Sequence, residues 1–397
     1  MKILTLAFLL ISFTMYAQPG CTDPQALNYS AAATINDGSC IYPVTALPLV
    51  TYTNLLSPLL NECSGIVQAD GKLWVQLDNT ALSLYNIDSV STTVFDSVAV
   101  LNTINTDWEE LGTDSAYIYI GDVGNNFGNR TNLHLLRLPL TSLDSVSVIP
   151  DTISYSYNDQ FTFTSSLNNT PFDCESFFIY NDSVHLFTKD WVTKWTKHYV
   201  MSSLPGVHVA ELVDSMNTGG LITSADILND SIVVLLGYNI GGPSEVFVWM
   251  LSDFQPGHFF SGNKRKLTCG PFFTIGQAEG ILLNKDLTGF ITNENVQSVV
   301  LPQLKKFDLN PYYALTTGLE NSKPDQDLIS FMNNQLLIHD KAIGSVIYIF
   351  NDVGQQVFHL KPTGSIVNLA NLHAGLYHVK LIKDANTTVL TVFVSSE

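Results

Sequence analysis

The chain has 397 residues, of which 46% are hydrophobic and 14% charged, so it can bury a substantial core and is not a disordered protein. Its 36 acidic residues against 18 Lys and Arg give a formal net charge of -18, which repels nucleic acid and anionic lipid and favours cations such as calcium. The composition therefore argues against a nucleic-acid-binding protein.

Residues 1–18 have the pattern of a secretory signal peptide. Met1-Lys2 precedes an apolar run from Ile3 to Phe13, and the small residue Ala17 stands near the expected cleavage point. No later stretch reaches about 18 uninterrupted apolar residues, so the sequence predicts no transmembrane span. We therefore expect an exported protein.

Residues 19–43 contain two cysteines, Cys21 and Cys40, whose disulfide would close a small loop and contribute about 3 kcal/mol in the chain-entropy model. The segment resembles a cysteine module of secreted Bacteroidota proteins, through Gly20-Cys21-Thr22-Asp23-Pro24 and Asp37-Gly38-Ser39-Cys40. The resemblance implies an extracellular spacer. Three polar side chains of the loop, Asp23, Asn28 and Asp37, either bind calcium or stabilise the turns of the loop.

Three further cysteines, Cys63, Cys174 and Cys269, leave at least one thiol without an intramolecular partner. Cys63 and Cys174 occupy the same place in a phrase that is repeated along the chain. We therefore expect both cysteines to be buried at equivalent positions of equivalent strands. A catalytic thiol is disfavoured, because no basic residue adjoins either cysteine to lower its pKa.

Residues 47–311 show strand signals with almost no helical periodicity, as in Lys72–Leu77 and Ile232–Leu236. A short polar phrase ending in a large apolar residue occurs five times, at 62–66, 107–111, 173–177, 223–227 and 277–281. A tight turn, a second strand and a polar cluster follow each copy, and repeats of roughly 50 residues suit four-stranded blades. The sequence predicts an all-β, five-bladed β-propeller whose last blade is completed by residues 49–54, with a six-bladed ring or a β-sandwich as alternatives.

This region resembles a group of secreted propellers from Bacteroidota without a settled activity. The matching segments are Asp107 to Glu110, Gly121 to Thr131, Asp173 to Glu175, Phe187 to Trp191, Phe260 to Lys266 and Gln277 to Gly280. The resemblance implies a fold and little chemistry. Lys264-Arg265-Lys266 is expected to be a solvated hairpin. Trp191 and Trp195 either line a sugar-binding rim or pack inside a blade.

Three of the repeated phrases carry a glutamate two residues before the apolar anchor, namely Glu109, Glu175 and Glu279. Residues two apart face the same side of a strand, so Asp107 and Asp173 would point the same way. If each phrase opens the innermost strand of its blade, these carboxylates converge in the central channel and raise one another's pKa values. The first and fourth copies carry Ser64 and Ala225 at this position, which predicts an asymmetric site.

Three interpretations of these acids stay open. They either cap turns, or hold calcium, or serve as the catalytic groups of a secreted hydrolase of glycans or phosphate esters. Glu109, Glu175 and Glu279 are the candidate catalytic residues, and the candidate metal ligands are Glu109, Glu175, Glu279, Asp122, Asn125 and Asn126. Contacts to an extracellular glycan, protein or phosphoester ligand are expected from Asp107, Asp173, Asp226, Lys189, Asp190, Asn293 and Glu294.

After a linker at 312–324, residues 325–397 alternate in short strands, which predicts a small Ig-like β-sandwich. The segment resembles the type A sorting domain of type IX secretion cargo, through Asp352-Val353-Gly354-Gln355 and Leu369 to Tyr377. Two features depart from that pattern: Met332-Asn333-Asn334 replaces the usual Asn-Pro, and Val394 to Glu397 replaces a basic end. The resemblance implies that the type IX machinery carries the protein through the periplasm to the outer surface or the medium.

Overall fold

The structure, a computed structural model, describes residues 17–55, 57–241, 244–296, 300–313, 329–332, 334–339, 345–351, 356–361, 366–369, 372–373, 375–383 and 386–394. Several sequence predictions lie wholly or mainly outside these residues: the signal peptide, the linker 312–324, the motif Asp352 to Gln355 and the chain end after Val394. The chain divides into two compact units, Met1–Ala314 and Leu315–Glu397.

Both units are all-β, as the sequence predicts. The described helical segments are the single turn α1 (Phe272–Ile275) and the 3-10 turns η1 (Pro58–Leu60), η2 (Leu140–Ser142) and η3 (Phe259–Ser261). Within the described part of the chain, every helix is too short or too polar to cross a membrane.

The first unit consists of antiparallel sheets that follow one another along the chain. The first sheet contains β5 (Cys63–Ala69), β6 (Lys72–Leu77), β7 (Ser83–Ile87) and β8 (Val94–Val100), with β12 (Ser147–Val148) parallel to β8. An eight-stranded sheet follows, in two halves that join where β13 and β17 run parallel. The halves are β9 (Trp108–Thr113), β10 (Tyr117–Asp122), β11 (His134–Pro139), β13 (Asp151–Tyr157), and β14 (Cys174–Tyr180), β15 (Ser183–Thr188), β16 (Trp195–Ser202), β17 (Gly206–Asn217).

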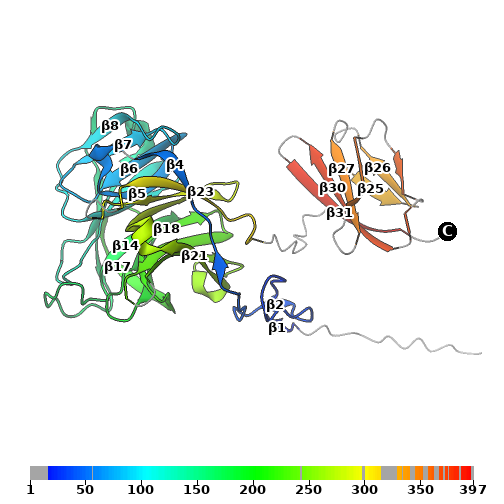
Figure 1. The fold of residues 1–397 in the computed structure, drawn as a ribbon, viewed down its shortest axis with the longest axis horizontal. Helices are drawn as coiled ribbons and strands as arrows, with labels where there is room; N and C mark the ends of the chain where they lie inside the picture. The colour runs from blue at the N-terminus through cyan, green and yellow to red at the C-terminus, as the bar shows by residue number, and fades with distance from the viewer. Residues whose placement is uncertain are drawn as a thin grey trace, which may run out of the picture. The chain divides into compact units, whose positions relative to one another are not determined.

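Two further sheets complete the unit. One contains β18 (Leu221–Leu228), β19 (Ile232–Asn239), β20 (Glu245–Ser252) and β21 (Asn263–Pro271), with β3 (Thr45–Ala46) parallel to β21. The other contains β22 (Ala278–Leu283), β23 (Thr288–Asn293), β24 (Gln303–Asp308) and β4 (Val50–Leu55). The early strand β4 pairs with β24, which confirms the predicted closure, and in Figure 1 the blue β4 joins the yellow sheet.

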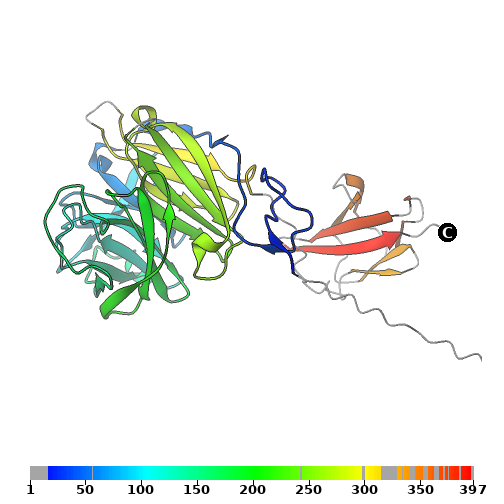
Figure 2. The same ribbon diagram turned by 90° about the horizontal axis from the view of Figure 1, so that it is seen from below.

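The sheets surround a common centre, seen from two directions in Figures 1 and 2. The first strands β5, β9, β14, β18 and β22 contact one another in this cyclic order, and β22 contacts β5. They approach so closely that a Cβ atom on Gly65 would lie 2.5 Å from the backbone nitrogen of Leu111. Large apolar side chains such as Trp74, Trp108 and Phe247 are fully buried between sheets. This arrangement is that of a β-propeller.

Tight hairpins connect the innermost strands to their neighbours. The turn Asp70-Gly71 joins β5 to β6, with φ angles of 49° and 70°, and Asn181-Asp182 joins β14 to β15, with φ angles of 48° and 56°. Two consecutive positive φ values define a turn whose twist matches that of the flanking strands, and Asn, Asp and Gly tolerate them. The turn residues therefore fix the register of both hairpins.

Every innermost strand contains a β-bulge at its repeated phrase, because the pairing register shifts there. The extra residues are Glu109, Glu175, Thr223 and Glu279, with Ser64-Gly65 in β5. The expectation that Ala225 shares the position of Glu109 is wrong, since Thr223 takes it. A shift of two residues keeps the same face of a strand toward the core, so the alternation of apolar residues could not reveal the error.

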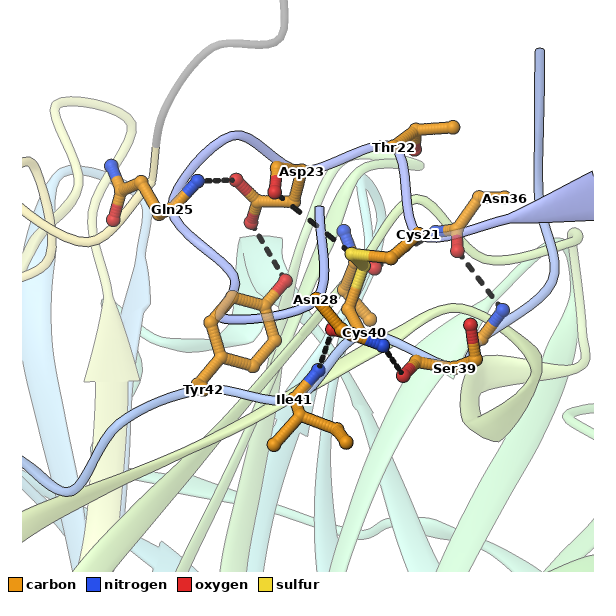
Figure 3. The surroundings of a disulfide bond; sticks show 12 residues. Cys21, Thr22, Asp23, Gln25, Asn28, Asn36, Ser39, Cys40, Ile41 and Tyr42 are labelled. Carbon is orange, nitrogen blue, oxygen red and sulfur yellow. Dashed lines mark hydrogen bonds between the residues drawn. A yellow bond between two sulfur atoms is a disulfide. The ribbon is translucent and has the colours of Figure 1, made fainter. Parts of the chain in front are cut away.

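The N-terminal module is held by the predicted disulfide between Cys21 and Cys40 (Figure 3). The Asp23 carboxylate accepts hydrogen bonds from the backbone N–H of Gln25 at 2.8 Å and from the Tyr42 hydroxyl at 2.7 Å. Asn28 and Asp37 make similar local bonds, to Ile41 and Ser39. These side chains thus stabilise turns, which is one of the two roles considered for them. Strands β1 (Pro19–Gly20) and β2 (Ile35–Asn36) pair within the module.

The basic run of β21 holds the module against the propeller within the first unit, so the expectation of a solvated hairpin is wrong. Lys264 donates hydrogen bonds from Nζ to the Gly38 carbonyl oxygen at 3.1 Å and to two nearby carbonyls. The buried Arg265 donates to Gln25 and, at 2.9 Å, to the carbonyl oxygen of Tyr312. A guanidinium carries several donors in a fixed fork, which lets Arg265 tie the module to the exit of the propeller.

We expect the double substitution Cys21→Ser, Cys40→Ser to unfold the module while the propeller stays folded. The described core of the module consists of Cys21, Ala26, Cys40 and part of Tyr42, so the disulfide, at about 3 kcal/mol, is its main support. Hydrogen exchange of residues 17–43 measures the effect. Cys269→Ser is the matched control, because Cys269 is a free cysteine, and unchanged protection in the double variant would contradict the prediction.

The second unit contains two sheets, in orange and red in Figure 1. One is formed by β25 (Ile329–Met332), β26 (Gln335–Ile338) and β29 (Ile366–Asn368), the other by β28 (Gln356–Leu360), β27 (Val346–Asn351), β30 (Gly375–Lys383) and β31 (Asn386–Val394). Leu336 and Ile338 from the first sheet share one buried cluster with Ile347, Ile349 and Val379 from the second. Two sheets around one core form a small sandwich.

Candidate functional site

The repeated phrases bring their glutamates together at the bulges of the innermost strands. Glu109, Glu175 and Glu279 are all buried. Burial raises the pKa of Glu109 well above its ordinary value, and the charge of Glu175 raises it further. The pKa of Glu175 is likewise raised by burial, with a contribution from Glu279. The three carboxylates therefore interact, as the shared register predicts.

Lys189 neutralises one half of this group. Its Nζ donates to Glu175 Oε2 and lies 3.9 Å from Glu279 Oε1, while the rings of Trp191 and Tyr238 lie 5.2 and 5.3 Å from it. Burial alone would lower the pKa of Lys189, but Glu175 and Glu279 hold it well above its ordinary value. Lys189 is thus a charged, fixed counter-ion.

The other half of the group is a cluster of carboxylates that we call the acidic triad: Asp78, Asp107 and Glu109. One oxygen from each lies within 4.8 Å of the other two. Two unit charges at that separation repel by about 3 kcal/mol at an effective dielectric constant of about 20. The triad could hold a metal ion, since a cation or protons must offset this repulsion.

Asp78 was not among the predicted site residues. It follows β6, and its backbone N–H donates to the Glu62 carbonyl oxygen at 2.8 Å. The same bond recurs from Lys189 to Asp173 at 2.9 Å and from Glu294 to Gln277 at 2.8 Å. Asp78 therefore occupies in its sheet the position that Lys189 occupies in another. Asp78 belongs to one of the polar clusters that follow the second strand of each repeat. The sequence did not show that these clusters lie close to the acids of the repeated phrases.

Gly124 holds the equivalent position beside β9 and leaves room for the triad. A Cβ atom on Gly124 would lie 2.4 Å from Asp107 Oδ2 and 2.5 Å from Glu109 Oε1. The space that a side chain would need is therefore taken by two carboxylates of the triad. Any larger residue at position 124 would displace them.

The triad acids at the edge of the group titrate at unusually high pH. Burial, and then the charge of Glu62, raises the pKa of Asp78 to about 6. Burial, and then the charge of Asp78, raises the pKa of Asp107 to about 7. Both residues are half-buried, whereas Glu109 is buried, so solvent reaches the triad from the side of Asp78 and Asp107.

We expect the metal-free protein to gain stability on acidification from pH 7.5 to pH 5.5. Because the pKa values of Asp78 and Asp107 are higher in the folded than in the unfolded chain, the folded state binds more protons over this range, and stability falls as pH rises toward 7. Thermal unfolding in EDTA should show a melting temperature higher by about 3 °C or more at pH 5.5, for a difference of about 1 kcal/mol. A melting temperature that rises with pH would contradict this prediction.

Glu279 contributes an unsatisfied atom to the group. Its side chain is 2% exposed, and Oε2 has no hydrogen-bond partner among the described residues. Burial raises the pKa of Glu279, while Lys189 and hydrogen bonding by Gln277 and Thr223 oppose the rise. A buried carboxylate oxygen without a partner is costly when it is ionised, so the raised pKa of Glu279 favours its protonated form.

The remaining predicted site residues make structural bonds. Asp173 accepts from the Asn125 N–H at 2.5 Å and from Trp191 Nε1 at 2.7 Å, and Asp190 caps the turn at Val192. Asn293 donates to the Glu294 carbonyl oxygen, Asp122 pairs with Arg130, and Asp226 accepts from the Leu283 N–H at 2.7 Å. Asn125 donates to the Phe172 carbonyl oxygen, and Asn126 lies next to it. The structure brings none of Asp122, Asn125 and Asn126 into the triad.

Glu110, the residue after Glu109, holds two of the innermost strands together. Its carboxylate accepts from the Ser224 hydroxyl and from the Ala225 N–H at 3.1 Å, so it links β9 to β18, which are not neighbours in the cyclic order. Burial raises the pKa of Glu110 well above its ordinary value. Sequence comparison of the phrases did not single it out, because only one other copy carries an acid at the same place, Asp226 in 223–227.

Solved structures with a similar chain path are β-propellers. They include the glutaminyl cyclase of Myxococcus xanthus (11% identity, 67% of this chain and 97% of that chain, TM-score 0.39) and a protein of Thermus thermophilus described as a putative oxidoreductase (glucose dehydrogenase) (8%, 66% and 100%, 0.36). The computationally designed Ika4 protein also matches (9%, 49% and 94%, 0.26). No family model and no curated protein matches the chain. Identities this low concern the fold alone.

Proposed function

We propose that this protein is a secreted or cell-surface β-propeller that binds a divalent cation, calcium, at Asp78, Asp107 and Glu109. The observation that carries the proposal is the convergence of three carboxylate oxygens within 4.8 Å, beside a lysine already engaged by other acids. The partner acids Glu175 and Glu279 are occupied by Lys189, so the triad is the half of the group that still needs positive charge.

The donor set favours calcium over softer metals. Carboxylate oxygens are hard ligands, and neither His nor Cys belongs to the triad. Two oxygens bound to one calcium ion at about 2.4 Å lie at most about 4.8 Å apart, which the triad satisfies. Calcium takes 6–8 oxygens, so water or a ligand would supply the rest.

The proposal extends to architecture and export. The cyclic contacts of β5, β9, β14, β18 and β22 support five blades, and residues 47–311 are proposed as the propeller, between the module 19–43 and the sandwich 325–397. We further propose type IX export, with residues 1–18 as signal peptide and the second unit as Ig-like sorting domain. The support is the sequence resemblance.

The alternative of a secreted hydrolase has weaker support. A glycosidase needs one protonated and one ionised carboxyl group at the reaction centre, and of the three candidate glutamates Glu175 is held by Lys189. Glu109 retains the raised pKa of a general acid, but it is buried behind Asp78 and Asp107. Among the residues that the structure describes, no geometric feature favours turnover over binding.

Calorimetric titration of the EDTA-treated protein with calcium tests the cation proposal. We expect one site, and a calcium concentration of 100 times Kd should stabilise the fold by about 2.7 kcal/mol, or raise the melting temperature by about 5 °C. Magnesium should bind more weakly, because it prefers a smaller octahedral shell and keeps its water. Absence of both heat and melting shift would overturn the proposal.

A further inference from the structure

Four exposed aromatic side chains lie at the same end of the propeller sheets as the acidic triad, and we call them the aromatic lip: Phe127, Phe161, Phe163 and Trp195. Their exposed fractions are 49%, 85%, 42% and 41%. They lie in the connections after β10 and β13 and at the start of β16, the ends at which the phrases of β9 and β14 begin. Large apolar groups so exposed at one end of a fold point to a binding surface.

Hydrogen bonds hold the loops of the lip together. The Phe127 carbonyl oxygen accepts from the Ser166 N–H at 2.9 Å, and the Gln160 side chain donates to the Gly128 carbonyl oxygen at 3.1 Å. Asp159 accepts from Lys197 Nζ at 2.6 Å, which places the loop of Phe161 beside the strand that begins with Trp195. Side chains on such fixed loops lose little conformational freedom when they bind a ligand.

The lip and the triad share one loop. Gly124 contacts the carboxylates of Asp107 and Glu109, and Phe127 follows only three residues later, a reach of at most about 11 Å. The turn between them is closed by a bond from the Gly128 N–H to the Asn125 carbonyl oxygen at 2.7 Å. A ligand that extends about 11 Å from the triad can therefore reach Phe127.

Charge and coordination select the kind of ligand. The triad supplies three carboxylates, and a calcium ion there keeps coordination positions for oxygens from the half-exposed side of Asp78 and Asp107. The surrounding acids and the net charge of -18 disfavour phosphoesters and acidic polymers. Neutral hydroxyl pairs can coordinate the ion, and an aromatic ring accepts the apolar C–H face of a sugar.

We propose that the aromatic lip and a calcium ion on Asp78, Asp107 and Glu109 together bind a neutral carbohydrate that carries vicinal hydroxyls. The inference rests on the proposed calcium site and adds the class of ligand. Two adjacent hydroxyls complete the coordination of the ion, and the ring packs on Phe127, with Phe161, Phe163 and Trp195 extending the contact along a chain of sugars.

Two soluble glucans test the inference on the whole mature protein. Dextran, an α-1,6-glucan, has adjacent free hydroxyls on every residue, whereas the internal residues of laminarin, a β-1,3-glucan, lack them. With calcium present we expect dextran to bind at least about tenfold more tightly than laminarin, and EDTA to abolish dextran binding. Phe127→Ala and Trp195→Ala should each weaken dextran binding about tenfold and leave the calorimetric calcium affinity unchanged. Phe95→Ala, at a more exposed aromatic on β8, should change neither.

The outcomes separate the two proposals. If calcium does not bind, the calcium site fails and this inference fails with it. If calcium binds but dextran does not, or dextran and laminarin bind alike, the calcium site stands and the carbohydrate inference is overturned. Dextran binding that survives EDTA also overturns it, because the ion would then contribute nothing to recognition.

Discussion

The substitution Asp107→Asn is expected to abolish calcium binding and, at the same time, to stabilise the calcium-free protein at pH 7.5. Asparagine keeps the size of the side chain but removes one of three carboxylates whose oxygens lie within 4.8 Å of one another. Each carboxylate pair that Asp107 forms in the triad contributes a repulsion of at most about 3 kcal/mol. The free energy of unfolding of the calcium-free protein should therefore rise by about 1 to 3 kcal/mol in Asp107→Asn. Calcium affinity should fall by about 100-fold or more.

Melting curves with and without calcium measure both effects. In the wild type calcium should raise the melting temperature, whereas Asp107→Asn should begin higher and respond to calcium by less than about 1 °C. Asp144→Asn is the matched control, since Asp144 is an exposed partner of Lys72 and should change neither curve. A variant that binds calcium like the wild type would remove Asp107 from the site.

The substitution Lys189→Met is expected to destabilise the first unit by about 3 to 5 kcal/mol at pH 7.5. It removes the cation that contacts Glu175 and Glu279, and removing one partner of a buried ion pair leaves an uncompensated charge. Because protons can replace the lost charge, the defect should shrink as pH falls toward 5. Urea unfolding at both pH values measures it.

The double variant Lys189→Met, Glu175→Gln controls for packing. If charge causes the defect, the second substitution should restore part of the lost stability, so the two effects will not add. If the double variant is as unstable as the sum of the single variants, the aliphatic stem of Lys189 matters rather than its charge. A loss below about 1 kcal/mol in Lys189→Met would contradict the role of Lys189 as a fixed counter-ion.

The sequence was sufficient where information is local and repeated. Five phrases with the same turn and strand behind them predict the sheets, and two cysteines in an exported segment predict the disulfide between Cys21 and Cys40. The convergence of Glu109, Glu175 and Glu279 also followed from their common place in the repeated phrases. These features depend on residues that are near one another in the chain or in equivalent copies.

The sequence was insufficient where contacts join different sheets. Asp78 meets Asp107 and Glu109 only because neighbouring sheets lie side by side, and no pattern within either sheet records that contact. The sequence also did not show that Thr223, rather than Ala225, takes the position of Glu109 in the fourth phrase. The reason is that residues two apart, such as Thr223 and Ala225, face the same side of a strand. The burial of Arg265 was not predicted from the sequence, because its hydrogen-bond partners, Gln25 and Tyr312, are far from it in the chain.

The pairing of β4 with β24 also determines the order in which the propeller can form. Val50 pairs with Lys306, so the ring stays open until nearly the whole first unit has been synthesised. Contacts of such long range are slow to form, and until then the edges of β4 and β24 remain unpaired and prone to aggregation. The nascent chain therefore depends on late closure, and a protein truncated before Gln303 should expose the edge of β23 instead of folding cooperatively.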